Sequence, residues 1–122
     1  MDIRSYCKEN FLIFDGAFGT ILQREGALKL GAHPNLLNLK NPDLIRSIHR
    51  RYLEVGSQVV TTNTFEANRV KLEGTGASVE EVIQKGIQIA KQAVKEVEAD
   101  AWVALDVGPI GQLLKPMGTL SF

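Results

Sequence analysis

Three short apolar runs alternate with helical patterns along this chain, and that alternation limits the folds that it can adopt. The runs are residues 11–14, 58–62 and 101–105. Each has the length of a buried strand, and each is followed by a cluster of small and polar residues. Strands separated by helices pair in parallel through right-handed crossovers. We therefore predict an α/β fold with a parallel βαβαβ arrangement over residues 1–122, with the 11–14 strand buried on both faces.

Helix signals fill the intervals between these runs. The clearest helix is capped by Asn41, carries Pro42 in its first turn and stops at Gly56. A second long helix opens with the capping box of Ser78 and Glu81. Shorter helices are expected before residue 11, at 20–23 and at 67–73, with an irregular connection at 28–40 and a loop at 107–122. The predicted buried stripes are Leu44, Ile45, Ile48, Tyr52 and Leu53 on the first long helix and Val82, Ile83, Ile87, Ala90, Val94 and Val97 on the second. Gly86 should lower the stability of the second helix by about 1 kcal/mol relative to alanine.

Composition and charge exclude several classes of protein. Hydrophobic residues make up 44% and charged residues 23% of the 122 residues, which is ordinary for a globular domain. Lys and Arg together number 14, as do Asp and Glu, so no net field attracts nucleic acid or an anionic membrane. No apolar run approaches the roughly 20 residues that span a bilayer. With Cys7 as its single cysteine, the chain is predicted to be a soluble cytoplasmic protein without disulfides.

The polar clusters that follow the apolar runs carry the candidate site. They are residues 15–20, 62–65 and 106–111. Parallel strands bring their carboxyl ends to one edge, so Asp15, Asn63 and Asp106 should surround one pocket mouth. The two carboxylates could accept hydrogen bonds from an ammonium group, and the Asn63 amide offers a donor and an acceptor. The alternative is ordinary turn chemistry, in which Asp15 satisfies loop amides.

Other chemistry-bearing residues give weaker signals. The glycine patterns at 16–19 and 108–111 lack the full spacing of a dinucleotide-binding loop or a phosphate-binding loop. His49 lies near an apolar helix stripe and is expected to be packed or surface-facing. His33 has no partner at a metal-ligand spacing, and Cys7 precedes the first strand, away from the strand ends. We predict neither a catalytic nor a metal-binding residue in this chain.

The same clusters, in this order, resemble those of the homocysteine S-methyltransferase family. The matching motifs are Phe14-Asp15-Gly16-Ala17-Phe18-Gly19-Thr20, Asn38-Leu39 with Asn41-Pro42-Asp43 and 49–56, Thr62-Asn63-Thr64-Phe65 with Ala67-Asn68, and Asp106-Val107-Gly108-Pro109-Ile110-Gly111 with 116–122. The match is especially similar to the N-terminal homocysteine-binding module of cobalamin-dependent methionine synthases.

The resemblance implies a fold, a reaction and a set of binding residues. The fold is a TIM (β/α)₈ barrel, of which residues 1–122 would supply the first three strands as a partial domain. The reaction transfers a methyl group to the thiol of homocysteine to make methionine, with zinc holding the sulfur as a thiolate and methylcobalamin as one of the methyl donors. By position, Asp15 would hold the homocysteine amino group. Gly16, Asn63, Thr64 and Asp106 would shape the amino-acid pocket.

The chain also departs from the family pattern. A barrel of this type usually needs about 250 residues, and the family's zinc ligands are cysteines on late strands with no counterpart here. The isolated chain is therefore expected to be an inactive N-terminal part of the enzyme. One alternative is a non-catalytic amino-acid-binding or assembly fragment that needs a partner chain. Another is an unrelated small α/β domain of the flavodoxin type. An open parallel edge also predicts self-association.

Overall fold

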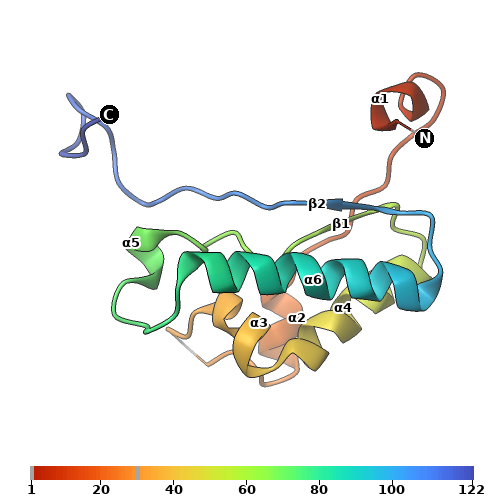
Figure 1. Cartoon of the computed structure of the whole chain (residues 1–122), viewed down its shortest axis with the longest axis horizontal. Coiled ribbons are helices and arrows are strands. Elements are labelled where there is room, and N and C mark those ends of the chain that lie inside the picture. The colour runs from red at the N-terminus through yellow and green to blue at the C-terminus, as the bar shows by residue number, and fades with distance from the viewer. Residues whose placement is uncertain (1, 30) are drawn as a thin grey trace.

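The computed structural model describes residues 2–29 and 31–122 as a small parallel sheet with every helix except the short α1 on one side (Figure 1). The elements in chain order are α1 (Ile3–Tyr6), α2 (Gly19–Arg24), the 3-10 helix η1 (Pro34–Leu36), α3 (Leu37–Lys40), α4 (Pro42–Glu54), β1 (Val59–Thr61), α5 (Arg69–Leu72), α6 (Val79–Val97) and β2 (Trp102–Ala104). This arrangement confirms the predicted α/β class. It does not by itself form a closed barrel.

The sheet is built on the parallel pair of β1 and β2. Val59 lies opposite Trp102, and Thr61 lies opposite Ala104. The segment before Asp15 runs along the other edge of β1, where Phe14 forms an isolated parallel bridge with Val59. The Val59 carbonyl accepts a hydrogen bond of 2.9 Å from the Asp15 N–H. The carboxyl ends of these three segments are therefore side by side, as the alternation of runs predicts.

The prediction that 11–14 is a strand buried on both faces is wrong. Pairing with β1 is limited to the bridge at Phe14 and to hydrogen bonds that the Ile13 carbonyl accepts from the N–H groups of Gln58 and Val59. The side chains of Phe11, Ile13 and Phe14 are 93%, 57% and 53% exposed. An apolar run is buried only where other elements of the fold cover it. The helices cover one face of β1, and no described element packs over the Phe11 end of this segment.

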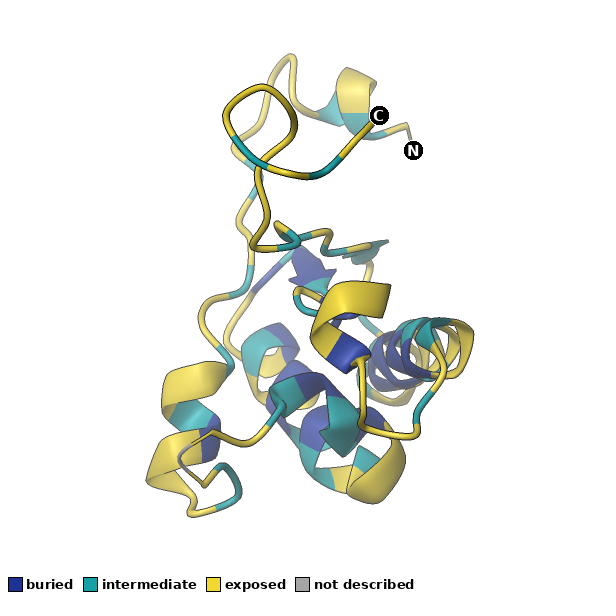
Figure 2. Ribbon diagram, turned by 90° about the vertical axis from the view of Figure 1, so that its left-hand side faces the viewer, coloured by how far each residue is buried: buried dark blue, intermediate teal, exposed yellow. Residues whose placement is uncertain are grey.

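Two long amphipathic helices, α4 and α6, form the layer beneath the sheet, and buried residues concentrate there (Figure 2). Leu22, Ile45, Ile48 and Ile89 make one core cluster, in which α2 joins the two helices. Val60 packs with Leu53, Ala90 and Ala93 in a second cluster that joins β1 to the helices. The layer therefore fixes the position of the strand ends.

The helix boundaries follow the predicted caps. The Asn41 side chain accepts a hydrogen bond from the Leu44 N–H, and the Ser78 hydroxyl accepts one of 3.1 Å from the Glu81 N–H. Gly56 follows α4 at φ +105°, a backbone conformation that favours glycine. The expected short helices before residue 11, at 20–23 and within 67–73 are present as α1, α2 and α5, and 107–122 contains no regular helix or strand.

Two local predictions need correction. The connection at 28–40 is not irregular throughout, because η1 and α3 occupy its second half. On α6 the fully buried residues are Val82, Gly86, Ile89, Ala90 and Ala93, whereas Ile83, Ile87, Val94 and Val97 are only partly buried. The stripe is rotated toward small residues because they allow α6 to approach its neighbours closely.

The opposite side of the sheet is sparsely covered. The opening helix α1 and the C-terminal segment both lie on that side, away from the helical layer (Figures 1 and 2). Near α1, the Tyr6 and Trp102 rings meet edge to face at 5.4 Å between centroids. No helix among the described residues is long and apolar enough to cross a membrane.

Candidate functional site

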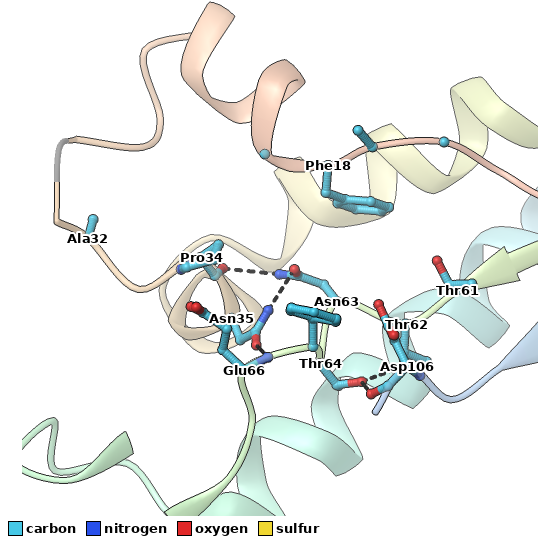
Figure 3. Close-up of a pocket in the computed structure, with 14 residues that line it drawn as sticks. Phe18, Ala32, Pro34, Asn35, Thr61, Thr62, Asn63, Thr64, Glu66 and Asp106 are labelled. Atoms are coloured by element: carbon cyan, nitrogen blue, oxygen red, sulfur yellow. Dashed lines mark hydrogen bonds between the residues drawn. The ribbon is translucent and has the colours of Figure 1, made fainter. Parts of the chain in front are cut away.

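A hollow of about 470 Å³ opens at the carboxyl ends of β1 and β2 (Figure 3). Its walls come from the loop after the first apolar run, the start of η1, the end of β1 with the segment that follows it, and Asp106 after β2. The lining residues are Gly16, Ala17, Phe18, Gly19, Ala32, Pro34, Asn35, Thr61, Thr62, Asn63, Thr64, Phe65, Glu66 and Asp106. Two of these residues are acidic and none is basic, so the lining favours a ligand with a positively charged group.

Asp15 lies beside this hollow, between the lining residues Gly16 and Thr61, and is not itself a lining residue. Its carboxylate is held by one neighbour. Thr61 donates its backbone N–H at 2.9 Å and its hydroxyl at 3.0 Å, one to each carboxylate oxygen. Thr61 belongs to β1, so the amide that bonds this carboxylate is a strand amide and not one of the loop amides that the alternative names. Each oxygen keeps further acceptor capacity.

The environment of Asp15 disfavours its negative charge. Burial raises the pKa of the Asp15 carboxyl above its usual value of 3.8, and the hydrogen bonds from Thr61 oppose that shift. The charge of Asp106 raises the same pKa further. The two carboxylates are therefore close enough to repel, and a cation placed between them would relieve that repulsion.

Asp106 is fixed by a closed ring of hydrogen bonds. Its N–H donates to the Thr62 hydroxyl at 3.1 Å, and its carbonyl accepts from the Thr64 hydroxyl at 2.7 Å. The two hydroxyl oxygens are 2.7 Å apart. Because the Thr64 hydrogen is given to Asp106, the Thr62 hydroxyl must be the donor to Thr64. The Thr64 hydroxyl is thus occupied in positioning Asp106.

Asn63 is the centre of a buried asparagine cluster, which Figure 3 shows in part. Its Oδ1 accepts from Asn35 at 2.8 Å, and its Nδ2 donates to Asn38 at 3.0 Å and to the Pro34 carbonyl at 3.1 Å. Asn38 in turn donates to the carbonyls of Asn63 and Val82. Both amide hydrogens of Asn63 are therefore engaged, and the residue shapes the pocket wall.

Sequence reasoning missed several of these partners. Asn35 and Asn38 are 1% and 0% exposed and were not predicted as site residues. Their spacing of three residues, in a segment rich in leucine, was the available signal, because it places both amides on one side of a helical turn. Thr61 carried no signal of its own, since its role depends on the register with Asp15.

Phe18 connects the hollow to the helical core. It lines the pocket, and its ring meets the buried His49 ring at 4.9 Å between centroids. His49 is 0% exposed, and neither ring nitrogen has a hydrogen-bond partner among the residues that the structure describes. Burial lowers the pKa of His49 to about 4, so its ring is neutral at physiological pH. Of the two predicted environments for His49, packed or surface-facing, the structure shows the packed one.

No metal-binding cluster forms among residues 2–29 and 31–122. No three His, Cys, Asp or Glu side chains of that part of the chain lie where they could hold an ion together. Cys7 is exposed, does not line the pocket and follows α1, which lies on the side of the sheet opposite the helical layer (Figure 1). The residues present therefore do not fit a zinc site.

The five predicted binding residues thus fall at one place. Gly16, Asn63, Thr64 and Asp106 line the same hollow, and Asp15 adjoins it between two lining residues. The predicted meeting of the three polar clusters occurs because the three extended segments run parallel. That these residues bind a substrate remains a prediction.

Comparisons with known proteins identify the relatives of this chain. The sequence model of a family described as "Homocysteine S-methyltransferase" matches residues 12–122. Betaine–homocysteine S-methyltransferase 1 of Xenopus laevis is 37% identical over 97 residues, which are 76% of this chain and 24% of the relative. Methionine synthase of Mycobacterium tuberculosis is 30% identical over 127 residues, covering 96% of this chain and 11% of that protein.

A solved structure gives the same answer. The crystal structure of the homocysteine methyltransferase MmuM from Escherichia coli, in its oxidized form, superposes with a TM-score of 0.74 at 27% identity. The match covers 89% of this chain and 41% of that one. A structure described as the metallated form of the same protein matches equally well, with a TM-score of 0.74. The chain spans about a quarter of the length of the first curated relatives that it matches. By its sequence and its structure, this chain belongs to the homocysteine S-methyltransferase family.

Proposed function

We propose that this chain provides the amino-acid-binding part of an enzyme that transfers a methyl group to the thiol of homocysteine, forming methionine. The acidic lining of the pocket at the strand ends carries the proposal. Homocysteine has one cationic group, its ammonium, and Asp106 with the adjoining Asp15 offers two carboxylates to it. Gly16, Asn63 and Thr64 complete the wall around the amino-acid end of the ligand.

The chain's own contribution is recognition and orientation. Thr61 holds the Asp15 carboxylate, and the hydroxyls of Thr62 and Thr64 hold the backbone of Asp106, so the Asp15 acceptor and the backbone that carries the Asp106 side chain are placed before a ligand arrives. Preorganised acceptors lose little freedom on binding, which favours affinity and a fixed direction of the thiol. For the whole reaction we propose that zinc holds the thiol as a thiolate, with ligands outside the described residues, and that methylcobalamin is one of the methyl donors. We also propose that the enzyme is cytoplasmic.

The test is a titration of the purified chain with homocysteine, compared with 4-mercaptobutyrate, which lacks only the amino group. We expect homocysteine to bind more tightly, and we expect Asp15→Asn and Asp106→Asn to remove most of that difference. Asp100→Asn is the matched control, because Asp100 is an exposed aspartate that does not line the pocket. Equal binding of the two compounds, or no binding of homocysteine, would contradict the proposal.

A second candidate function is assembly with another chain through the open sheet edge. Among the described residues no strand pairs with the outer edge of β2. Leu105 and Val107, which follow β2, are 50% and 79% exposed. An unpaired parallel edge with apolar neighbours invites pairing with a second copy, and a charged side chain on that edge opposes it.

Sedimentation velocity over a range of concentrations tests this candidate. We expect the native chain to associate as its concentration rises, and we expect Val107→Lys to weaken that association. Val55→Lys is the control, since Val55 is 83% exposed but lies after α4, away from the edge. A chain that stays monomeric at every concentration, or equal association of the two variants, would rule out assembly through this edge.

A further inference from the structure

One wall of the pocket, the loop Gly16–Phe18, rests on helix α4. The contact begins at Gly16, which lines the pocket and lies against Tyr52 of that helix. A Cβ atom at Gly16 would be 2.9 Å from the Tyr52 hydroxyl oxygen and 3.3 Å from the ring carbon Cε1. The first of these distances is too short for a real contact. Because that oxygen is the end of a side chain, an alanine at residue 16 would displace the Tyr52 hydroxyl from this place.

The same hydroxyl bonds the next residue of the loop. The Tyr52 O–H donates to the Ala17 carbonyl at 2.8 Å. The third residue, Phe18, has its ring centroid 6.3 Å from that of Tyr52 and 4.9 Å from that of His49, one turn earlier on α4. Three successive pocket residues are thus seated on two side chains of one helix.

We propose that Tyr52 is a positioning residue, whose hydroxyl holds the loop Gly16–Phe18 in the conformation that forms the amino-acid pocket. The inference rests on the proposed function and deepens it. Tyr52 does not line the pocket, so it acts on the ligand only through the loop. Asp15 immediately precedes this loop, so the direction in which the chain leaves Asp15 depends on the same contact.

A purely structural role for Tyr52 makes a different prediction. Its hydrogen bond to Ala17 lies at the surface, where loss of one hydroxyl changes global stability little. If the bond serves only the fold, removing it should affect stability and binding no more than the loss of another tyrosine hydroxyl does. If it selects the loop conformation, the binding-competent fraction falls and the apparent affinity falls with it.

The experiment compares Tyr52→Phe with Tyr6→Phe. The Tyr6 hydroxyl accepts a hydrogen bond from the Gln58 side chain, and Tyr6 belongs to α1 and does not line the pocket. Homocysteine affinity is measured by calorimetry, melting temperature by circular dichroism, and the order of the Gly16–Phe18 amides by NMR relaxation. We expect Tyr52→Phe to weaken homocysteine binding by about fivefold and to loosen these amides, with a melting temperature similar to that of Tyr6→Phe. Tyr6→Phe should leave both the affinity and the loop unchanged.

A double-mutant cycle then tests the contact itself. Gly16→Ala should impair binding strongly in the native background and much less in the Tyr52→Phe background, because the atom nearest the new methyl group is the hydroxyl oxygen. Equal homocysteine affinity of Tyr52→Phe and Tyr6→Phe, or full additivity in the cycle, would overturn the inference. If the native chain does not bind homocysteine, the proposed function fails instead. In that case the NMR relaxation of the Gly16–Phe18 amides is the remaining test, and unchanged order of these amides in Tyr52→Phe overturns the positioning role.

Discussion

Thr61 and Asp15 are joined by two hydrogen bonds, since Thr61 donates its backbone N–H at 2.9 Å and its hydroxyl at 3.0 Å to the two carboxylate oxygens of Asp15. The residues are 46 positions apart in the chain and belong to neighbouring extended segments. The bond pair ties the loop that begins at Asp15 to the end of β1. It also opposes the rise in the Asp15 pKa that burial produces.

Replacing Thr61 by valine should therefore raise the pKa of the Asp15 carboxyl further. The backbone hydrogen bond survives and the hydroxyl bond is lost, at a cost of about 1 kcal/mol in unfolding free energy at neutral pH. The measurement is a ¹³C NMR titration of the Asp15 carboxyl. Thr119→Val is the control, because Thr119 is exposed. A lowered or unchanged Asp15 pKa in Thr61→Val would show that the hydroxyl does not favour the charged form.

Asp15 should also give the chain an unusual dependence of stability on pH. Because its folded pKa is raised above 3.8, the unfolded chain loses this proton first as the pH rises. The contribution of Asp15 to the unfolding free energy is therefore fully present below about pH 3.8 and is lost as the pH rises through the folded value. The difference in unfolding free energy between the native chain and Asp15→Asn, followed by urea denaturation, should fall over that interval. A difference that grows with pH would contradict the raised pKa.

The contribution of His49 to the unfolding free energy should depend on pH in the opposite direction. Its folded pKa of about 4 lies below the usual 6.5, so its contribution to stability is complete above pH 6.5 and is lost as the pH falls toward 4. The difference between the two pKa values corresponds to a loss of about 3 kcal/mol in unfolding free energy. His49→Leu removes two buried nitrogens that have no partner, so we expect little change in stability at pH 7 and a flatter acid limb in urea denaturation. The same loss of stability between pH 6.5 and 4 in both proteins would exclude His49 as its source.

The sequence predicts best those features that depend on residues close together along the chain. The caps at Asn41 and Ser78 act within one turn, and both helices begin where those residues place them. The meeting of Asp15, Asn63 and Asp106 follows from parallel pairing alone, so it could also be predicted. The exposure of Phe11 could not, because burial of an apolar run depends on elements elsewhere in the chain. The partner of Asp15 was missed for the same reason, since Thr61 reaches it only through the register of the folded chain.

Gly86 shows how a local rule can be overridden by packing. Helix propensity alone predicts that alanine at this position would stabilise α6 by about 1 kcal/mol. In the structure, a Cβ atom at residue 86 would be 2.8 Å from the Thr64 Cγ2 atom and 2.9 Å from the Asn38 Nδ2 atom. Gly86 therefore allows α6 to pack directly against the pocket wall.

Gly86→Ala should destabilise the chain by about 1 to 3 kcal/mol, because the methyl group must displace Thr64 or Asn38. Both belong to the hydrogen-bond networks behind the pocket, so homocysteine binding should weaken as well. Gln84→Ala is the control on the same helix, since Gln84 is exposed and its replacement should change stability by only a few tenths of a kcal/mol. Thermal and urea unfolding of the two variants make the comparison. A Gly86→Ala chain more stable than the native one would mean that helix propensity, and not close approach to Thr64, governs this position.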